Sequence, residues 1–235
     1  MSNFNELAAL LPTLLEGAGV TVAVSVVSYL LALFLGLVLG LARTARLLPV
    51  RAAAAAYVQF MRGTPLLLQL FFIYYVLPYG GLILSPFQAG VLGLTLNYAA
   101  YMAEVFRAGI AAVPKGQFEA GASLALTHRQ LMAYVVIPQA LKIVVPPIGN
   151  FFVAIFKDSA LVSVITMKDL MFTGQILASS TFMHFQIFAM VAAIYLMLSY
   201  PAAKAVEWLE RRLDKQSAAR APNRRESSSP LVEAS

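Results

Sequence analysis

A long run without charged side chains, residues 17–42, constrains this chain more than any other feature. As a helix rising about 1.5 Å per residue, this run is roughly 39 Å long, which is enough to cross a bilayer with some tilt. Four further apolar segments follow, at about 52–77, 87–112, 139–156 and 182–203. The 235-residue chain is 60% hydrophobic and only 12% charged, whereas soluble domains carry roughly 25% charged residues. The sequence therefore predicts an all-α integral membrane protein with five transmembrane helices.

The second apolar segment contains a break, Gly63-Thr64-Pro65, directly after its one charged residue, Arg62. Threonine is a good N-cap and proline suits the first turn of a helix. We therefore expect a discontinuous membrane helix that restarts after Thr64.

The distribution of basic residues predicts the orientation in the membrane. With five spans, one side carries Arg43, Arg46, Arg51, Lys115, Arg129, Arg211, Arg212, Lys215, Arg220, Arg224 and Arg225, and the other only Lys157 and Lys168. The positive-inside rule makes the first side cytoplasmic. Residues 1–16 are then an external N-terminal segment, residues 17–212 the transmembrane domain, and residues 213–235 a disordered cytoplasmic tail.

The composition also excludes several kinds of site. There is no cysteine, and the two histidines, His128 and His184, lie too far apart in the sequence to suggest a metal site. The net charge of +6 follows from the residues that flank the apolar segments, so we expect no nucleic-acid partner. We also expect no catalytic residue, no metal and no cofactor bound by this chain.

The polar stretch 114–138 interrupts the apolar segments and predicts a cytoplasmic helix–turn–helix. Gly121 and Ala125 are four residues apart and would share one face of small residues on its first helix. Thr127 and Gln130 fit a capping box for its second helix, which should stop before Pro138. An ordinary loop on the membrane surface is the alternative that periodicity leaves open.

The stretch from Glu119-Ala120-Gly121 to Val135-x-Ile137-Pro138, with Ala125 between them, resembles the EAA loop of permease subunits of ABC importers. The family pattern is E-A-A, three residues, G, nine residues, I-x-L-P. Further motifs resemble the polar amino-acid uptake subfamily: Arg62-Gly-Thr-Pro65-Leu-Leu-Leu-Gln69, Asn97 to Ile110, Pro114-Lys-Gly-Gln117, Pro146-Pro147 with Asn150, and Lys157-Asp158-Ser159. The resemblance covers about residues 17–212.

This resemblance implies a MetI-like ABC permease fold in a bacterial inner membrane. It implies as partners a second permease subunit (identical or related), a soluble substrate-binding protein, membrane lipid and a dimer of separate ATPase subunits that hold ATP and Mg. The chain has no G-x-x-x-x-G-K-[ST] phosphate loop, so it is not the ATPase itself. A secondary transporter or channel without an ATPase, and a membrane enzyme, are the competing function classes.

The family role of the EAA loop predicts that Glu119, Ala120, Gly121, Ala125 and Pro138 contact the ATPase. Gly121 and Ala125 depart from the family pattern but stay small. Alanine adopts a positive φ less readily than glycine. If the family bend needs a positive φ, the helix should run straighter here.

Polar residues in or beside the spans are candidates for the substrate path. They are Arg62, Thr64, Asn97, Glu104, Arg107, Asn150, Lys157 and Asp158. Arg62 beside the helix break suggests a site for an amino-acid carboxylate. Most of them have a structural alternative: a local ion pair for Glu104 with Arg107, contacts between helices for the asparagines, and a solvated helix end for Lys157-Asp158. The alternative for Arg62 is a pair with a backbone carbonyl or with Glu104.

Overall fold

The computed structural model describes residues 2–218. All the regular secondary structure in this part of the chain is helical, and it contains no β-strand. The elements, in order, are α1 (Ser2–Ala42), α2 (Leu48–Gly63), α3 (Leu66–Phe71), the π-turn η1 (Phe72–Val76), the 3₁₀ turn η2 (Leu77–Gly80), α4 (Pro86–Ala111), α5 (Lys115–Ser123), α6 (His128–Leu131), the π-turn η3 (Met132–Val136), α7 (Ile137–Asp158), the 3₁₀ turn η4 (Ser159–Ile165), α8 (Leu170–Thr181) and α9 (His184–Ala218).

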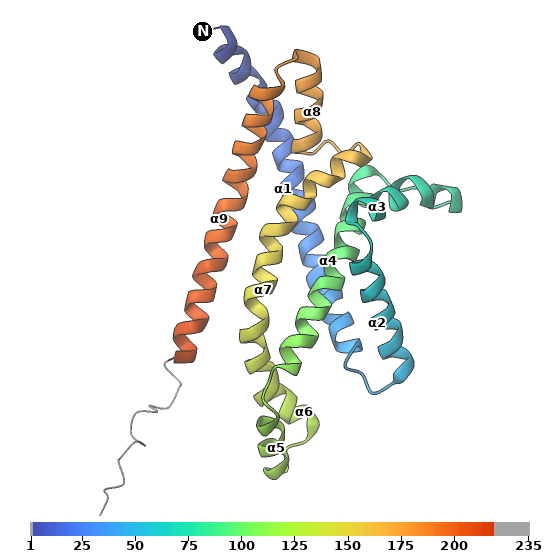
Figure 1. The fold of residues 1–235 in the computed structure, drawn as a ribbon, viewed down its shortest axis with the longest axis vertical. Coiled ribbons are helices and arrows are strands. Elements are labelled where there is room, and N and C mark those ends of the chain that lie inside the picture. Colours follow the sequence, from blue (N-terminus) through green and yellow to red (C-terminus); the bar gives the residue numbers. More distant parts are fainter. Residues whose placement is uncertain (1, 219–235) are drawn as a thin grey trace, which may run out of the picture.

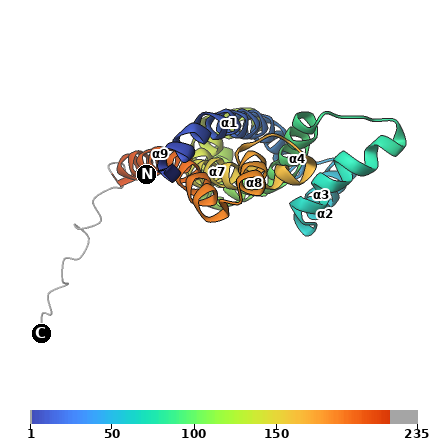
Figure 2. The same ribbon diagram turned by 90° about the horizontal axis from the view of Figure 1, so that it is seen from above.

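The long helices α1, α4, α7 and α9 run along the long axis of the molecule, and α5 and α6 lie together at one end (Figure 1). The helix α8 lies at the opposite end. The α3 region extends sideways from the body of the protein (Figure 2). The predicted helix–turn–helix thus lies at the far end of the molecule from α8.

Helices α1 and α4 pack closely because two glycines of α1 have no side chain. A Cβ on Gly36 would lie 2.7 Å from the Cβ of Met102, and one on Gly40 would lie 2.8 Å from the Cβ of Phe106. Neither contact is sterically possible for a larger residue without a shift of the helices. Around this contact lies the main apolar core, which includes Val24, Leu70, Leu94, Met102 and Ile155.

Three helical stretches within residues 2–218 are long and apolar enough to cross a membrane: Glu6–Ala42, His128–Ile165 and His184–Arg212. Leu48–Gly63 with Leu66–Gly80 qualifies as a fourth if this pair, bent by 104°, is one span. The third predicted span, α4, has 26 residues but is not in this group. It carries polar residues such as Asn97 and Glu104 among its apolar ones. The count of five spans therefore stays a prediction.

The predicted break in the second segment is confirmed, but its capping is different. Thr64 is the C-cap of α2, and its Oγ1 donates a hydrogen bond of 3.0 Å to the carbonyl of Phe60. Pro65 takes the N-cap position of α3, where no side chain caps the helix. The prediction that Thr64 caps the restarted helix is wrong, because its hydroxyl is used by the helix that ends there.

The predicted terminal segments do not begin and end at element boundaries. Residues 2–16 are part of α1 and continue into the first predicted span without a break. The helix α9 runs to Ala218, past the predicted start of the tail at residue 213. Residues 219–235 of the predicted tail lie outside the described residues.

Candidate functional site

A cavity of about 410 Å³ opens where the break between α2 and α3 faces α4 and the end of α7. Its lining includes four predicted path residues: Arg62, Thr64, Asn97 and Asp158. The rest of the lining is Gly63, Pro65, Leu66, Tyr98, Tyr101, Phe151 and Ala154. The fold thus brings together residues that are far apart in the sequence, because the broken helix leaves room beside α4.

The wall of this cavity carries one cationic and one anionic side chain. The guanidinium of Arg62 lies over the ring of Tyr101, with its Cζ 5.4 Å from the ring centroid. The carboxylate of Asp158 accepts a hydrogen bond of 2.7 Å from the hydroxyl of Tyr98, a buried residue. Arg62 is exposed and Asp158 is half-buried, so both charged groups are accessible. A site with both charges suits a zwitterion.

Asn97 joins α4 to the broken helix. Its Nδ2 donates to the Oε1 of Gln69 at 3.1 Å and to the carbonyl of Met61 at 3.4 Å. The interpretation of Asn97 as a contact between helices is therefore confirmed, although Asn97 also lines the cavity. Gln69 belongs to the sequence motif that begins at Arg62, but nothing in that pattern indicated its role.

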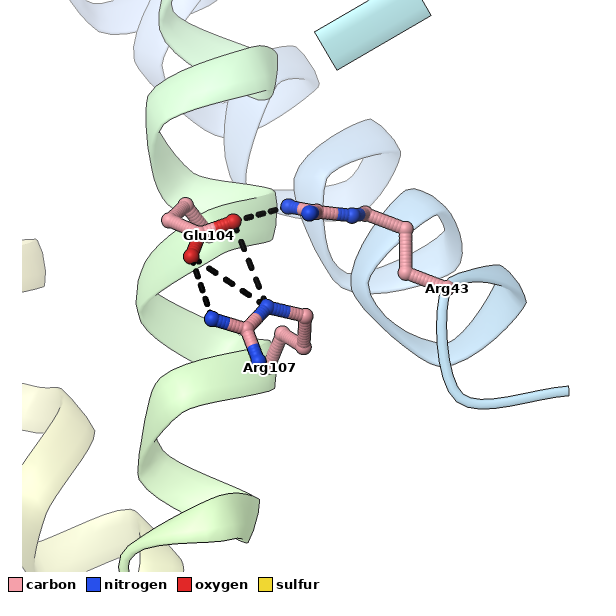
Figure 3. A network of polar contacts seen from close by, with 3 residues as sticks. All are labelled: Arg43, Glu104 and Arg107. Atoms are coloured by element: carbon pink, nitrogen blue, oxygen red, sulfur yellow. Dashed lines mark hydrogen bonds and ion pairs between the residues drawn. The ribbon is translucent and has the colours of Figure 1, made fainter. Parts of the chain in front are cut away.

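Glu104 lies in an ion-pair network away from this cavity (Figure 3). Its carboxylate accepts hydrogen bonds from Nε of Arg107, at 3.2 and 3.3 Å, and from Arg43 at the end of α1. The local pair of Glu104 and Arg107 is thus confirmed, and Arg43 is the partner that sequence reasoning missed. The suggested pairing of Arg62 with Glu104 is not found among the described residues. This network links the ends of α1 and α4.

Two of the remaining path residues do not join the cavity. Lys157 is exposed at the end of α7, next to Asp158, as expected for a solvated helix end. Asn150 is exposed on α7. Neither residue is among those that line the cavity.

The helix–turn–helix at 114–138 is present, and its capping box is formed. The hydroxyl of Thr127 accepts from the backbone N–H of Gln130 at 3.4 Å. The backbone N–H of Thr127 donates to the Oε1 of Gln130 at 2.9 Å. The capping box starts a second helix at His128, as predicted.

The prediction that the helix runs straighter at Ala125 is wrong. Helix α5 ends at Ser123, and Ala125 has a φ of 56°. The backbone N–H of Leu126 donates to the carbonyl of Gly121 at 3.1 Å and that of Ala125 to Ala122 at 3.0 Å. This pair of bonds is a Schellman ending, which commonly places glycine at the position of Ala125. The chain keeps the bend with alanine in the left-handed region.

Gly121 and Ala125 do not share a face, which is a second correction. Gly121 is buried, and a Cβ there would lie 2.4 Å from the Cδ1 of Leu131. Because Gly121 has no side chain, α5 can pack on α6. Gly121 therefore contributes to the packing inside the helix–turn–helix. Exposed positions of the motif are Glu119, Ala120, Ala125 and Pro138. Leu124 and Tyr134, 74% and 78% exposed, lie beside them and were missed.

The second helix does not stop before Pro138, which is a third correction. The π-turn η3 leads directly into α7, with Pro138 in its first turn. Proline lacks a backbone N–H and crowds the preceding turn. A wider turn relieves this crowding, and the Nε2 of Gln139 donates to the carbonyl of Val135 at 2.9 Å. The helix–turn–helix is therefore joined directly to α7.

Comparison with known proteins gives a family and close relatives. The family described as "Binding-protein-dependent transport system inner membrane component" matches residues 32–215. The probable glutamine ABC transporter permease protein GlnM of Bacillus subtilis (strain 168) is 40% identical over 201 residues, which are 86% of this chain and 93% of the relative. The glutamine transport system permease protein GlnP of Escherichia coli (strain K12) is 35% identical over 205 residues, 86% of this chain and 94% of the relative.

Solved structures are also similar. The crystal structure of an amino acid ABC transporter with histidines has a TM-score of 0.85 at 38% identity, covering 89% of this chain and 98% of that one. An inward-facing structure of the MetNI methionine ABC transporter has a TM-score of 0.71 at 21% identity and covers 87% and 98%. The second similarity shows the fold alone.

Proposed function

This chain belongs to the family of binding-protein-dependent transport system inner membrane components, and on that premise we propose that it carries polar amino acids. It is the permease subunit of an ABC importer and a multi-pass inner-membrane protein, with ATP hydrolysis on a separate chain. The amino-acid substrate is proposed from the relatives, named for glutamine transport, and from the geometry of the cavity.

The cavity with Arg62 and Asp158 on its wall is the observation that carries this proposal. A guanidinium binds a carboxylate well, and a carboxylate binds an ammonium group. Every free amino acid has both groups at its α-carbon. In the proposed site, Arg62 binds the α-carboxylate and Asp158 the α-ammonium group. The cavity volume of about 410 Å³ is within the range of small-molecule sites.

The helix–turn–helix is proposed as the contact with the ATPase. Glu119 supplies an exposed carboxylate, and the exposed Leu124 and Tyr134 supply apolar area beside it. The continuous path from α6 through η3 into α7 supports transmission of an ATPase movement to the cavity. Asp158 is the last residue of that same α7.

The complete transporter in this proposal has several chains. A second permease subunit, an ATPase dimer that holds ATP and Mg, and a soluble binding protein complete it. The charge distribution supports an external N-terminus and a cytoplasmic C-terminus.

The test is reconstitution of the permease in proteoliposomes with its ATPase and its binding protein. Labelled glutamine, histidine, arginine and glutamate are supplied outside, and uptake is measured with and without ATP inside. We expect uptake of at least one of them that needs ATP and the binding protein. Arg62→Met should abolish this uptake while the complex still assembles. Uptake that persists without the ATPase would instead support a secondary transporter.

A further inference from the structure

We propose that Gln69 is a positioning residue that holds the broken helix in place and orients the amide of Asn97 toward the substrate cavity. This inference rests on the proposed function of that cavity. Gln69 lies on α3 and is 8% exposed. It lines a separate apolar cavity of about 350 Å³, so its effect on substrate must pass through other residues.

The break at Gly63-Thr64-Pro65 leaves carbonyl groups at the end of α2 without their usual helical partners. The side-chain amide of Gln69 supplies donors to this end. Its Nε2 lies 2.9 Å from the carbonyl oxygen of Met61, 3.2 Å from that of Thr64 and 2.7 Å from the Thr64 Oγ1. One side chain thus joins both sides of the break.

The orientation of both amides follows from these acceptors. A carbonyl oxygen only accepts, so Gln69 must present its NH₂ group to Met61 and Thr64. Its Oε1 then faces α4 and accepts from the Nδ2 of Asn97. Asn97 also donates from Nδ2 to Met61.

The Oδ1 of Asn97 is therefore the free end of this chain of hydrogen bonds. Within residues 2–218 it accepts no hydrogen bond, and Asn97 lines the same cavity as Asp158. An acceptor at this point adds to the carboxylate of Asp158 in binding an ammonium group. Without Gln69, the amide of Asn97 keeps only its longer bond of 3.4 Å to the carbonyl of Met61, so its direction is less firmly fixed.

The residue after Gln69 fixes α3 on α4. Leu70 is fully buried, and a Cβ on Gly93 would lie 2.6 Å from its Cδ2. Because Gly93 has no side chain, Leu70 can pack directly against α4 at this position. This contact holds Gln69 close to Asn97. Gln69 thereby also fixes the positions of Arg62 and Thr64, because they lie in the segment of the chain whose carbonyl groups it binds.

The first test replaces Gln69 by glutamate, which keeps the shape but cannot donate when ionised. Affinity for the amino acid that the wild type transports is measured by equilibrium dialysis on the permease–ATPase complex at pH 8 and pH 5. Loss of the donors should weaken binding about tenfold relative to wild type at pH 8. At pH 5 a protonated glutamate donates again, and the ratio should move back toward one. Gln69→Leu should show the loss at both pH values.

Gln88→Glu is the matched control. Gln88 is exposed, and its Oε1 accepts from the backbone N–H of Ser85, which a carboxylate also does. This variant should bind as the wild type does. Wild-type affinity of Gln69→Glu at both pH values would overturn the proposal, since mere filling of space would survive the isosteric change.

A second measurement does not depend on the substrate. The chain has no cysteine, and a Cβ on Gly63 has nothing within 4 Å, so Gly63→Cys places a single label at the break. Adding Gln69→Glu should change the rate of its reaction with a small thiosulfonate by about threefold or more, because the break opens locally. Adding Gln88→Glu should not. An unchanged rate overturns the positioning role, whereas a changed rate with no amino-acid binding to the wild type refutes only the proposed function.

Discussion

The hydroxyl of Tyr98 on α4 donates a hydrogen bond of 2.7 Å to the carboxylate of Asp158, the last residue of α7. This contact joins two helices at the cavity and fixes the direction of the one anionic group that lines it. Tyr98 is a buried residue, while Asp158 is half-buried and lines the cavity, so Tyr98 holds Asp158 and leaves it free to bind a cation.

Tyr98→Phe should therefore reduce transport. The change removes one hydrogen bond to a charged group, which contributes about 1.5–3 kcal/mol, and leaves the packing of the ring. We expect uptake in proteoliposomes at a substrate concentration below saturation to fall about tenfold. Tyr79, which is 93% exposed, is the matched position, and Tyr79→Phe should transport normally. Equal uptake by the two variants would show that Asp158 needs no such support.

Glu104→Gln should destabilise the complex because it leaves Arg43 and Arg107 facing each other without their shared carboxylate (Figure 3). The network is partly exposed, so a loss of about 1–2 kcal/mol is expected rather than the larger value of a fully buried pair. The measurement is thermal unfolding in detergent. Glu207→Gln, which breaks the exposed pair with Lys204, is the control and should leave the melting temperature unchanged.

Much of this fold follows from the order of apolar segments and breakers. The break at Gly63-Thr64-Pro65 and the capping box of Thr127 with Gln130 are local features, and both are confirmed. The cavity depends on which helices pack against each other. The sequence therefore predicted Arg62 and Asp158 as residues of the substrate path, but it did not show that Tyr98 and Gln69 bind the residues around this cavity. Local propensity also misled at Ala125, because the packing of α5 on α6 keeps the bend against the preference of alanine.

Gly121→Val should disrupt the helix–turn–helix. A Cβ at this position would lie 2.4 Å from the Cδ1 of Leu131, so α5 and α6 must separate or Leu131 must move. We expect reduced co-purification with the ATPase and reduced uptake. Gly116→Val is the control, because a Cβ there meets nothing within 4 Å. If adding Leu131→Ala restores co-purification and uptake, the defect lies in the packing between α5 and α6. If it restores neither, the defect lies at the surface that contacts the ATPase.

Ala125→Gly should stabilise the bend after α5. Ala125 has a φ of 56°, which costs a residue with a Cβ about 1 kcal/mol, whereas glycine adopts this conformation freely. Part of that gain is lost to the larger entropy of glycine in the unfolded chain. Hydrogen exchange of the 114–138 segment should slow. Ala122→Gly, inside α5, should speed it, since glycine weakens a helix interior. If hydrogen exchange changed in the same direction in both variants, the claim that Ala125 is strained in the left-handed region would be contradicted.

Asp169 should make the stability of the α8 end of the molecule depend on pH. It is fully buried at the start of α8, accepts from the backbone N–H of Phe172 at 2.9 Å, and receives the hydroxyl of Tyr195 at 3.3 Å. Burial raises the pKa of Asp169 to about 6, because it disfavours the charged form. The folded protein thus binds a proton between about pH 4 and pH 6 that the unfolded chain releases. Stability from this group is full below pH 4 and is lost as the pH rises through 6.

The size of this effect and its control can both be measured. A rise of about two pKa units corresponds to roughly 3 kcal/mol, although other carboxylates impose their own pH dependence. The comparison is therefore with Asp169→Asn, which still caps α8 but does not titrate. The melting temperature of the wild type, relative to this variant, should fall as the pH is raised from 4 to 7. A constant difference between the two proteins over this range would mean that Asp169 has the same pKa in the folded and unfolded states.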